Sequence, residues 1–258
     1  MKLYLLLITI IIQSGCYAQN SSLSSQANKF LNSLSADQLK KALYDFEDDE
    51  RYNWHFVPMN NRKGIMLSEL DEQQKELGFG LLKFYLSDTG LKKTQEIIQL
   101  ELILKELENR PKEDKHRDPG NYTIIFFGKP SDTIPWGWRF EGHHVSFNFS
   151  TIGNKIVAGT PGFMGSNPAI VLSGPQKGKQ ILKTETELGF ELVRSFTSQQ
   201  SAKAIISQDV PGEIVTSNAR KAIIENQQGI FYSEMNNDQQ QGCSILKNKK
   251  GSKQRRCG

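Results

Sequence analysis

The order in which two hydrophobic periods follow one another is the strongest constraint that this chain places on its fold. From residue 27 to residue 109, apolar residues recur at helical spacing, as Leu39, Leu43 and Phe46 do. From 123 to 172 the chain instead holds short β-branched and aromatic runs separated by Pro and Gly, and helical spacing returns after Thr184. This order predicts an α+β fold with N-terminal helices, a central, mainly antiparallel sheet with a hairpin, and C-terminal helices.

Capping signals and breakers predict where the helices begin and end. Ser35–Gln38 has the spacing of a capping box, and Thr184–Glu187 repeats that spacing before the C-terminal helix. Asp88-Thr89-Gly90 separates the second helix from the third, which must end before Pro111 because proline lacks an amide hydrogen. The segment 217–227 predicts one further short helix.

Four segments of the middle region read as strands. Thr123 to Phe127 is β-branched and aromatic throughout, as in a strand buried on both faces. The segment 139–150 is the longest predicted strand, and Gly153-Asn154 predicts a hairpin turn into Lys155 to Gly159. Ala169 to Leu172 predicts another short strand.

The first residues are typical of a secretory leader. Lys2 precedes an apolar run from Leu3 to Ile12, and Cys16-Tyr17-Ala18 fits a small-residue cleavage site. The apolar run is about 10 residues long, whereas a membrane-spanning helix needs about 20. We therefore predict a signal peptide over residues 1–18, no transmembrane segment and an exported (periplasmic or secreted) protein. The alternative is a lipoprotein anchored through Cys16, because Ser14-Gly15-Cys16 resembles the end of a lipobox.

The positive charge of the chain is concentrated at its C-terminal end. The whole chain carries a net charge of +4, and residues 243–258 contain six basic residues and no acidic one. The remainder therefore has a net charge of −2, which gives no electrostatic reason to expect binding to nucleic acid. Because residues 236–258 show no apolar period, we predict that they form a disordered basic tail.

One stretch concentrates the residue types that carry chemistry. Trp136 to Asn148 contains two of the four histidines and two of the three tryptophans, together with Arg139 and Glu141. Alternate side chains of a regular strand point to opposite faces. A single strand would therefore place Arg139, Glu141 and His143 on an apolar row and His144 on a polar row with Ser146 and Asn148, unless Gly142 forms a bulge.

Three kinds of chemistry fit these residues. An imidazole titrates near neutral pH and can act as a general acid or base, while neutral imidazole and carboxylate suit a divalent transition metal. A guanidinium and indole rings can hold an anionic or aromatic ligand. The predicted catalytic residues are His144, His143, Glu141 and Arg139. The predicted ligand-binding residues are Trp136, Trp138, Asn148 and Ser146. The predicted metal ligands are His143, His144 and Glu141.

Packing alone is the competing explanation for the same stretch. Two adjacent histidines beside a glutamate often form a hydrogen-bond network that holds loops together, and tryptophans more often pack than bind a ligand. A single strand also offers few metal ligands by itself. The residue types are compatible with a reactive site and equally with a structural hydrogen-bond network.

Motifs along most of the chain resemble a bacterial family of domains of unknown function, numbered 3500. The resemblance spans roughly residues 30 to 235 and is carried most specifically by the run from Trp136 to His144. The other matching elements are Trp54 with Pro58, Arg62-Lys63-Gly64, Leu81-Leu82 through Leu86-Ser87 and Gly90, Leu100-Glu101, Arg117-Asp118-Pro119 with Tyr122, Phe127 to Pro130, Phe163 through Pro168-Ala169, and Gly174-Pro175 with Gly178.

The resemblance implies a shared fold and, in many members, export, but no activity. It also implies that members continue beyond this point, so we expect a single α+β family domain over residues 27–235 that is incomplete at its C-terminus. We predict an exported enzyme, a hydrolase or oxidoreductase that depends on metal or histidine and acts on an unknown small molecule. The alternative is a non-catalytic protein that binds a small ligand or envelope component.

Overall fold

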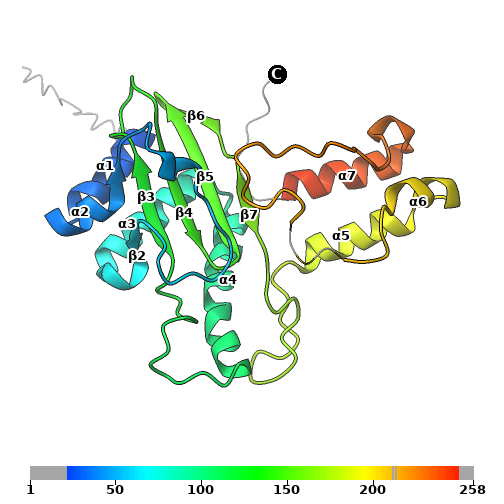
Figure 1. The fold of residues 1–258 in the computed structure, drawn as a ribbon, viewed down its shortest axis with the longest axis horizontal. Helices are drawn as coiled ribbons and strands as arrows, with labels where there is room; N and C mark the ends of the chain where they lie inside the picture. Colours follow the sequence, from blue (N-terminus) through cyan, green and yellow to red (C-terminus); the bar gives the residue numbers. More distant parts are fainter. Residues whose placement is uncertain (1–21, 211, 213, 250–258) are drawn as a thin grey trace, which may run out of the picture.

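A seven-stranded sheet lies between N-terminal and C-terminal helices in the computed structural model, which describes residues 22–210, 212 and 214–249 (Figure 1). The predicted α+β arrangement is confirmed. The predicted signal peptide over residues 1–18 lies outside the described residues. No helix in the described part of the chain is both long enough and apolar enough to cross a membrane.

The N-terminal helices begin where the sequence supplies side-chain caps. The predicted capping box of Ser35 with Gln38 is present at the start of the second helix, and the Ser87 side chain accepts a hydrogen bond from the Gly90 amide at the start of the fourth. The third helix begins at a capping box formed by Asp71 and Gln74. These helices are α1 (Leu23–Ser33), α2 (Ala36–Ala42), α3 (Glu72–Tyr85) and α4 (Asp88–Leu107), with short 3-10 turns η1 (Asp49–Tyr52) and η2 (Leu67–Glu69) between them.

The sheet has the order β1-β3-β4-β5-β6, with β2 beside β3 and β7 beside β5. Only the β1–β3 pair is parallel, so the sheet is mainly antiparallel as predicted. The predicted hairpin turn at Gly153-Asn154 joins β5 to β6. The strands are β1 (Leu43–Tyr44), β2 (Ile65–Met66), β3 (Thr123–Phe127), β4 (Trp136–Gly142), β5 (Val145–Ile152), β6 (Lys155–Ala158) and β7 (Gly162–Met164).

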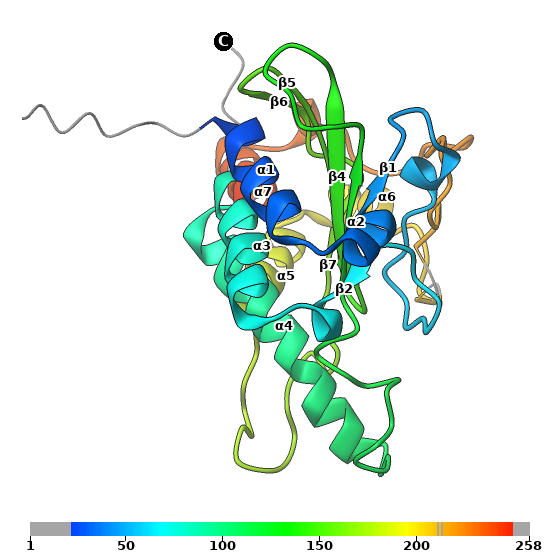
Figure 2. The ribbon, with the colours of Figure 1, turned by 90° about the vertical axis from the view of Figure 1, so that its left-hand side faces the viewer.

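The core lies between one face of the sheet and the helices α1, α3 and α4, which stand on the same side of it (Figure 2). Phe126 of β3 stacks on Phe30 of α1 and on Trp138 of β4. Tyr85 of α3 contacts Trp138 edge-on, with ring centroids 5.0 Å apart. Every residue of β3 is buried, which confirms the prediction of a strand covered on both faces.

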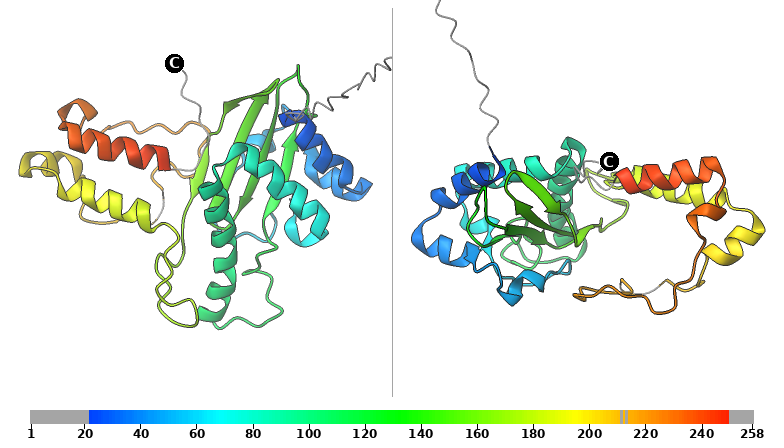
Figure 3. Two further views of the ribbon diagram at one scale, coloured as in Figure 1. Left: turned by 180° about the vertical axis from the view of Figure 1, so that it is seen from behind. Right: turned by 90° about the horizontal axis from the view of Figure 1, so that it is seen from above.

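The C-terminal helices form an arm that stands away from the sheet and from helices α1–α4 (Figures 1 and 3). The arm contains α5 (Lys183–Arg194), α6 (Ser198–Ala204), the turn η3 (Tyr232–Glu234) and α7 (Asn237–Lys249), and α5 packs against α7. The structure differs here from the predicted disordered tail over residues 236–258, of which 250–258 lie outside the described residues. Polar contacts hold α7 in place: Gln239 Nε2 donates to Ser195 O (2.8 Å), and its side chain also bonds to Gln200.

Two other predicted elements are wrong. Residues 169–172 do not form a strand but part of a closed loop, in which Val171 N donates to Lys179 O and Gly178 N to Val171 O. Residues 217–227 form turns rather than a helix. Helix α5 is present, but it starts at Lys183 without a side-chain cap, so the predicted cap at Thr184 is absent.

Candidate functional site

The two histidines form the tight turn of a hairpin rather than the middle of one strand. Gly142, at the end of β4, pairs with Val145, at the start of β5, so only His143 and His144 connect the two strands. His144 has a φ of +78°, which is uncommon for a residue other than glycine. Its amide donates to Phe56 O and its carbonyl accepts from Gly165 N, each at 2.8 Å. These two bonds hold a conformation that local sequence preferences disfavour.

Because of this turn, the side chains lie on other faces of the sheet than predicted. In the paired strands Arg139 lies opposite Asn148, and Glu141 lies opposite Ser146. These four side chains therefore share one face of the sheet, whereas a single regular strand over 139–150 would have separated them. Gly142 pairs regularly and forms no bulge. A side chain there is excluded, since an added Cβ would lie 2.2 Å from the Tyr122 ring.

Arg139 and Glu141 are buried and contact η1 and the segment between η1 and β2. Arg139 Nη2 lies 2.6 Å from Glu50 Oε1, and Arg139 Nη1 donates to Glu50 O. Glu141 Oε1 pairs with Arg62 Nη1 at 3.1 Å, and Glu141 Oε2 accepts from the His55 amide and lies 3.1 Å from Arg139 Nε. Both side chains are therefore bonded to neighbouring protein groups, and neither lines the pocket described below; their catalytic role stays a prediction.

The predicted ligand-binding residues are buried or lie at most half-buried among neighbouring protein groups. Trp136 and Trp138 are fully buried between the sheet and the helices. Ser146 donates to Glu141 Oε2 at 3.3 Å, and Asn148 Nδ2 donates to Pro161 O at 3.0 Å. None of these four residues lines the pocket described below, and their role in ligand binding stays a prediction.

His143 points into a buried ionic cluster. Its Nδ1 makes a short hydrogen bond to Glu101 Oε1 of α4, and Arg117 Nη1 lies 3.2 Å from the same nitrogen. Because a carboxylate oxygen only accepts, Nδ1 carries the proton in this contact. The Tyr122 hydroxyl donates to His143 O at 2.6 Å. The cluster continues to the surface through Arg117 and Glu108, which are joined by a bond of 2.6 Å. Arg117 and Arg110 lower the pKa of Glu108 to about 2.

His144 has a different environment from its neighbour, although the two ring centroids are only 4.2 Å apart. Its Nδ1 is shielded from solvent and has no hydrogen-bond partner in the described structure. Burial, and after it the nearby His143 and Arg117, lowers the pKa of His144 to about 4. The imidazole is therefore neutral at physiological pH, with one nitrogen able to donate and the other able to accept.

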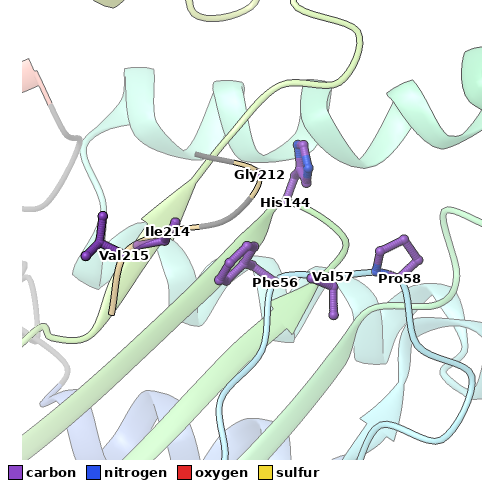
Figure 4. A pocket seen from close by; sticks show the side chains of 7 residues that line it. All are labelled: Phe56, Val57, Pro58, His144, Gly212, Ile214 and Val215. Carbon is purple, nitrogen blue, oxygen red and sulfur yellow. The ribbon is translucent and has the colours of Figure 1, made fainter. Parts of the chain in front are cut away.

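A pocket of about 510 Å³ adjoins His144. Figure 4 shows Ile214 and Val215 on one side of the pocket and Val57 and Pro58 on the other, with Phe56 between them. The pocket thus lies between the segment that follows η1 and the segment that joins α6 to η3. The lining residues are Phe56, Val57, Pro58, His144, Gly212, Ile214 and Val215.

The predicted metal ligands do not come together. Glu141 is directed to Arg62, His143 to Glu101, and His144 to the pocket. Within residues 22–210, 212 and 214–249, no three His, Cys, Asp or Glu side chains are grouped closely enough to hold a metal ion. The side chains of the described residues therefore do not support the predicted transition-metal site.

The family of proteins of unknown function DUF3500 matches residues 17–248, which is most of the chain. The chain belongs to this family. The match extends past residue 235 and includes nearly all of α7. No curated protein and no solved structure matches the chain.

In this DUF3500 domain, motifs distant in sequence converge on the histidine turn. Glu101 and Arg117 contact His143, Tyr122 bonds its carbonyl, and Arg62 pairs with Glu141. All four of these residues belong to the motifs that resemble the family, as does Phe163, whose ring meets the His144 ring edge-on. The prediction from residue types missed them because it considered one strand only, although the dispersed motifs already marked them.

Proposed function

We propose that this DUF3500 protein binds a small molecule in the pocket at His144 and does not catalyse a reaction. One observation carries the proposal. Of the eight side chains predicted for the site, His144 alone is directed to a cavity and makes no hydrogen bond to the described protein. Ligand sites are typically apolar pockets of this size whose walls carry a small number of polar groups.

The protonation properties of His144 support binding over acid–base catalysis. An effective general base has a pKa near the working pH, whereas burial lowers the pKa of His144 to about 4. His143 is enclosed and already bonded to Glu101. The turn therefore offers a fixed, neutral hydrogen-bonding group rather than a proton carrier.

A screen of the full chain by thermal unfolding tests the proposal. We expect compounds from a fragment library to stabilise the native protein, since a ligand that binds only the folded state raises the unfolding temperature. His144→Asn and His144→Gly should abolish these shifts, because both residues tolerate a positive φ and remove the imidazole. The matched control is His116→Asn, since His116 does not line this pocket. Hits that stabilise the His144 variants as strongly as the native chain would sink the proposal.

A histidine-dependent enzyme is the second candidate. The Glu101 carboxylate orients His143 as carboxylates orient catalytic imidazoles, and the His143 ring lies against the His144 ring. This candidate requires product to form from a bound compound and turnover to be lost in His143→Gln. Binding without product under conditions that saturate the pocket favours the first proposal.

We also propose that the protein is exported. Lys2, the apolar run Leu3 to Ile12 and the sequence Cys16-Tyr17-Ala18 support this localisation. Mass spectrometry of the mature N-terminus in the producing cell separates the outcomes. A chain that starts at Gln19 indicates a cleaved leader, a lipid-modified Cys16 indicates an anchored lipoprotein, and an intact Met1 in the cytoplasmic fraction contradicts export.

A further inference from the structure

The two sides of the His144 pocket are held to the protein in different ways. On one side, Phe56 is buried, its ring stacks on Phe163 with centroids 4.2 Å apart, and its carbonyl accepts from the His144 amide at 2.8 Å. On the other side, Ile214 and Val215 are 39% and 72% exposed (Figure 4). The first side is therefore fixed by the core, whereas burial holds the second side only weakly.

The second side belongs to a segment whose shape is set by its own hydrogen bonds. Residues 214–220, which we call the strap, form turns and a bend. Ser217 N donates to Ile214 O at 2.8 Å, and Ala219 N donates to Thr216 O at 3.0 Å. Because these bonds join groups within the strap, they can persist while the strap moves as a unit.

Two side chains of the strap contact the segment that contains η1, and Figure 2 shows the two segments side by side. Arg220 Cζ lies 3.7 Å from the centroid of the Tyr52 ring, and Asn218 Nδ2 lies 3.3 Å from His55 Nδ1. His55 Nε2 lies 3.0 Å from Asn53 Oδ1, an oxygen that only accepts, so Nε2 carries the proton and Nδ1 accepts from Asn218. Single contacts of these two kinds stabilise a structure only modestly.

We infer that the strap is a movable cover of the pocket, which lifts from Tyr52 and His55 to admit a small molecule to His144. The inference rests on the proposed function, because it assigns the entry route of the same pocket. Opening breaks one hydrogen bond and one cation–π contact, and it leaves the stacked rings of Phe56 and Phe163 in place. Loops with few buried contacts open locally at a small cost in free energy, and such opening controls access to many binding sites.

Carbethoxylation by diethyl pyrocarbonate measures the opening of the strap without a ligand. A neutral imidazole attacks a carbonyl carbon of the reagent through its lone pair, and the leaving group decays to ethanol and carbon dioxide. His144 is neutral at pH 7, because burial lowers its pKa to about 4. Mass spectrometry of peptides from the treated full chain gives the rate of reaction at each histidine.

Removal of both contacts should speed the reaction at His144. We expect Asn218→Ala combined with Arg220→Ala to raise the rate about five- to fiftyfold, since the two contacts together shift the open population by about that factor. Arg220→Lys keeps a cation over the same ring and should stay within about threefold of the native rate. The matched control is Arg194→Ala, which removes a cation–π contact inside the C-terminal arm and should leave the native rate unchanged.

His143 reports whether the fold is intact, since it is buried and bonded to Glu101. A faster reaction at His144 in the double variant, with His143 unchanged, supports the strap. Equal rates in the native chain and the double variant, or an equal acceleration at both histidines, would overturn it. A native His144 that reacts as fast as a histidine in an unfolded peptide would also overturn it, because the ring would then be uncovered.

The fragment screen separates this inference from the proposed function. If compounds bind through His144 but the double variant reacts no faster, the pocket binds ligands and the strap is wrong. If the double variant reacts faster but no compound depends on His144, the strap opens as inferred and the binding function fails.

Discussion

Arg139 and Glu141 precede Gly142 and the two histidines follow it, and yet of these four residues only His144 lies beside the pocket. Arg139 and Glu141 are at most 1% exposed, and each contacts more than one protein group. His143 is likewise bonded to Glu101, but His144 has a shielded Nδ1 without a partner and lies beside a cavity. The difference teaches that a concentration of polar residue types does not mark a site by itself. Trp138 Nε1 also lacks a partner, so it is the combination of an unpartnered polar atom with a neighbouring cavity that distinguishes His144.

Arg139 and Glu141 are expected to affect the stability of the fold, whereas His144 is expected to affect ligand binding. Buried ion pairs contribute little net stability, but removing one partner leaves an uncompensated charge. The Arg139–Glu141 pair should therefore be costly to disturb and irrelevant to ligand affinity. His144 should show the reverse, with small effects on the fold at neutral pH and large effects on binding.

The largest effect is expected from Glu141→Gln. Arg62 and Arg139 would keep their buried positions but lose the shared carboxylate, so the free energy of unfolding should fall by about 3–5 kcal/mol. Urea denaturation measures the loss. The control is Glu72→Gln, since Glu72 is 88% exposed and pairs with Lys75, and its effect should stay within about 0.5 kcal/mol. Similar losses in the two variants would show that the buried network has no special role.

The pH dependence of the free energy of unfolding should reveal the lowered pKa of His144. Its folded-state pKa of about 4 lies below the ordinary value of 6.5, so the unfolded chain binds the proton more readily. The contribution of His144 is therefore complete above about pH 6.5, and about 3 kcal/mol of it is lost as the pH falls toward about 4. The difference in unfolding free energy between the native chain and His144→Asn, measured across this window, isolates the effect from that of carboxylates. A constant difference across the window would contradict the buried, neutral imidazole.

Glu101→Gln should have an intermediate effect. It removes the charge from a carboxylate that binds His143 and lies near Arg117, so we expect a loss of about 1.5–3 kcal/mol in chemical denaturation. Faster hydrogen exchange at the amides of His144 and Gly165 should accompany the loss, because His143 anchors the turn. Glu108→Gln is the matched control, since Glu108 also binds Arg117 but is 31% exposed. An equal effect of the two substitutions on exchange at the turn would argue against an anchoring role for Glu101.

The smallest effect is expected from Ser146→Ala. The hydroxyl donates to Glu141 at 3.3 Å and accepts from Asn148 at 3.3 Å, so both hydrogen bonds are long. We expect the loss to be about 0.5–1 kcal/mol, with ligand affinity unchanged. Thermal unfolding with and without a bound probe measures both quantities. A selective loss of affinity would place the polar face of the sheet in the binding site after all.

Local signals in the sequence predicted much of the fold. The capping box at Ser35 and the hairpin at Gly153-Asn154 act within a few residues, and both are present in the structure. The predicted break at Asp88-Thr89-Gly90 lies one residue too late, because these residues form the first turn of α4. Strand β3 was also predictable, because its composition is apolar throughout.

The predictions failed where distant contacts override local preference. His143-His144 lacks the Asn-Gly or Asp-Gly signal of a tight hairpin turn, and the bonds from Phe56 and Gly165 hold His144 at its positive φ. Because the turn was not predicted, side chains were expected to alternate between the two faces of the sheet through His143 and His144 as well. Arg139 and Glu141 were then assigned to the wrong face, although the turn brings both opposite Asn148 and Ser146.

The sequence by itself determined the order of helices and strands and the concentration of ionisable groups around Gly142, because caps, breakers and apolar periods are local properties of the chain. Only the tertiary structure decided which of those groups has a partner. Glu101 lies 42 residues before His143, and the amide that binds Glu141 lies 86 residues before it. Hydrogen-bond satisfaction and burial depend on such contacts between distant segments, so only the folded chain leaves the His144 imidazole neutral, without a partner, beside an apolar pocket.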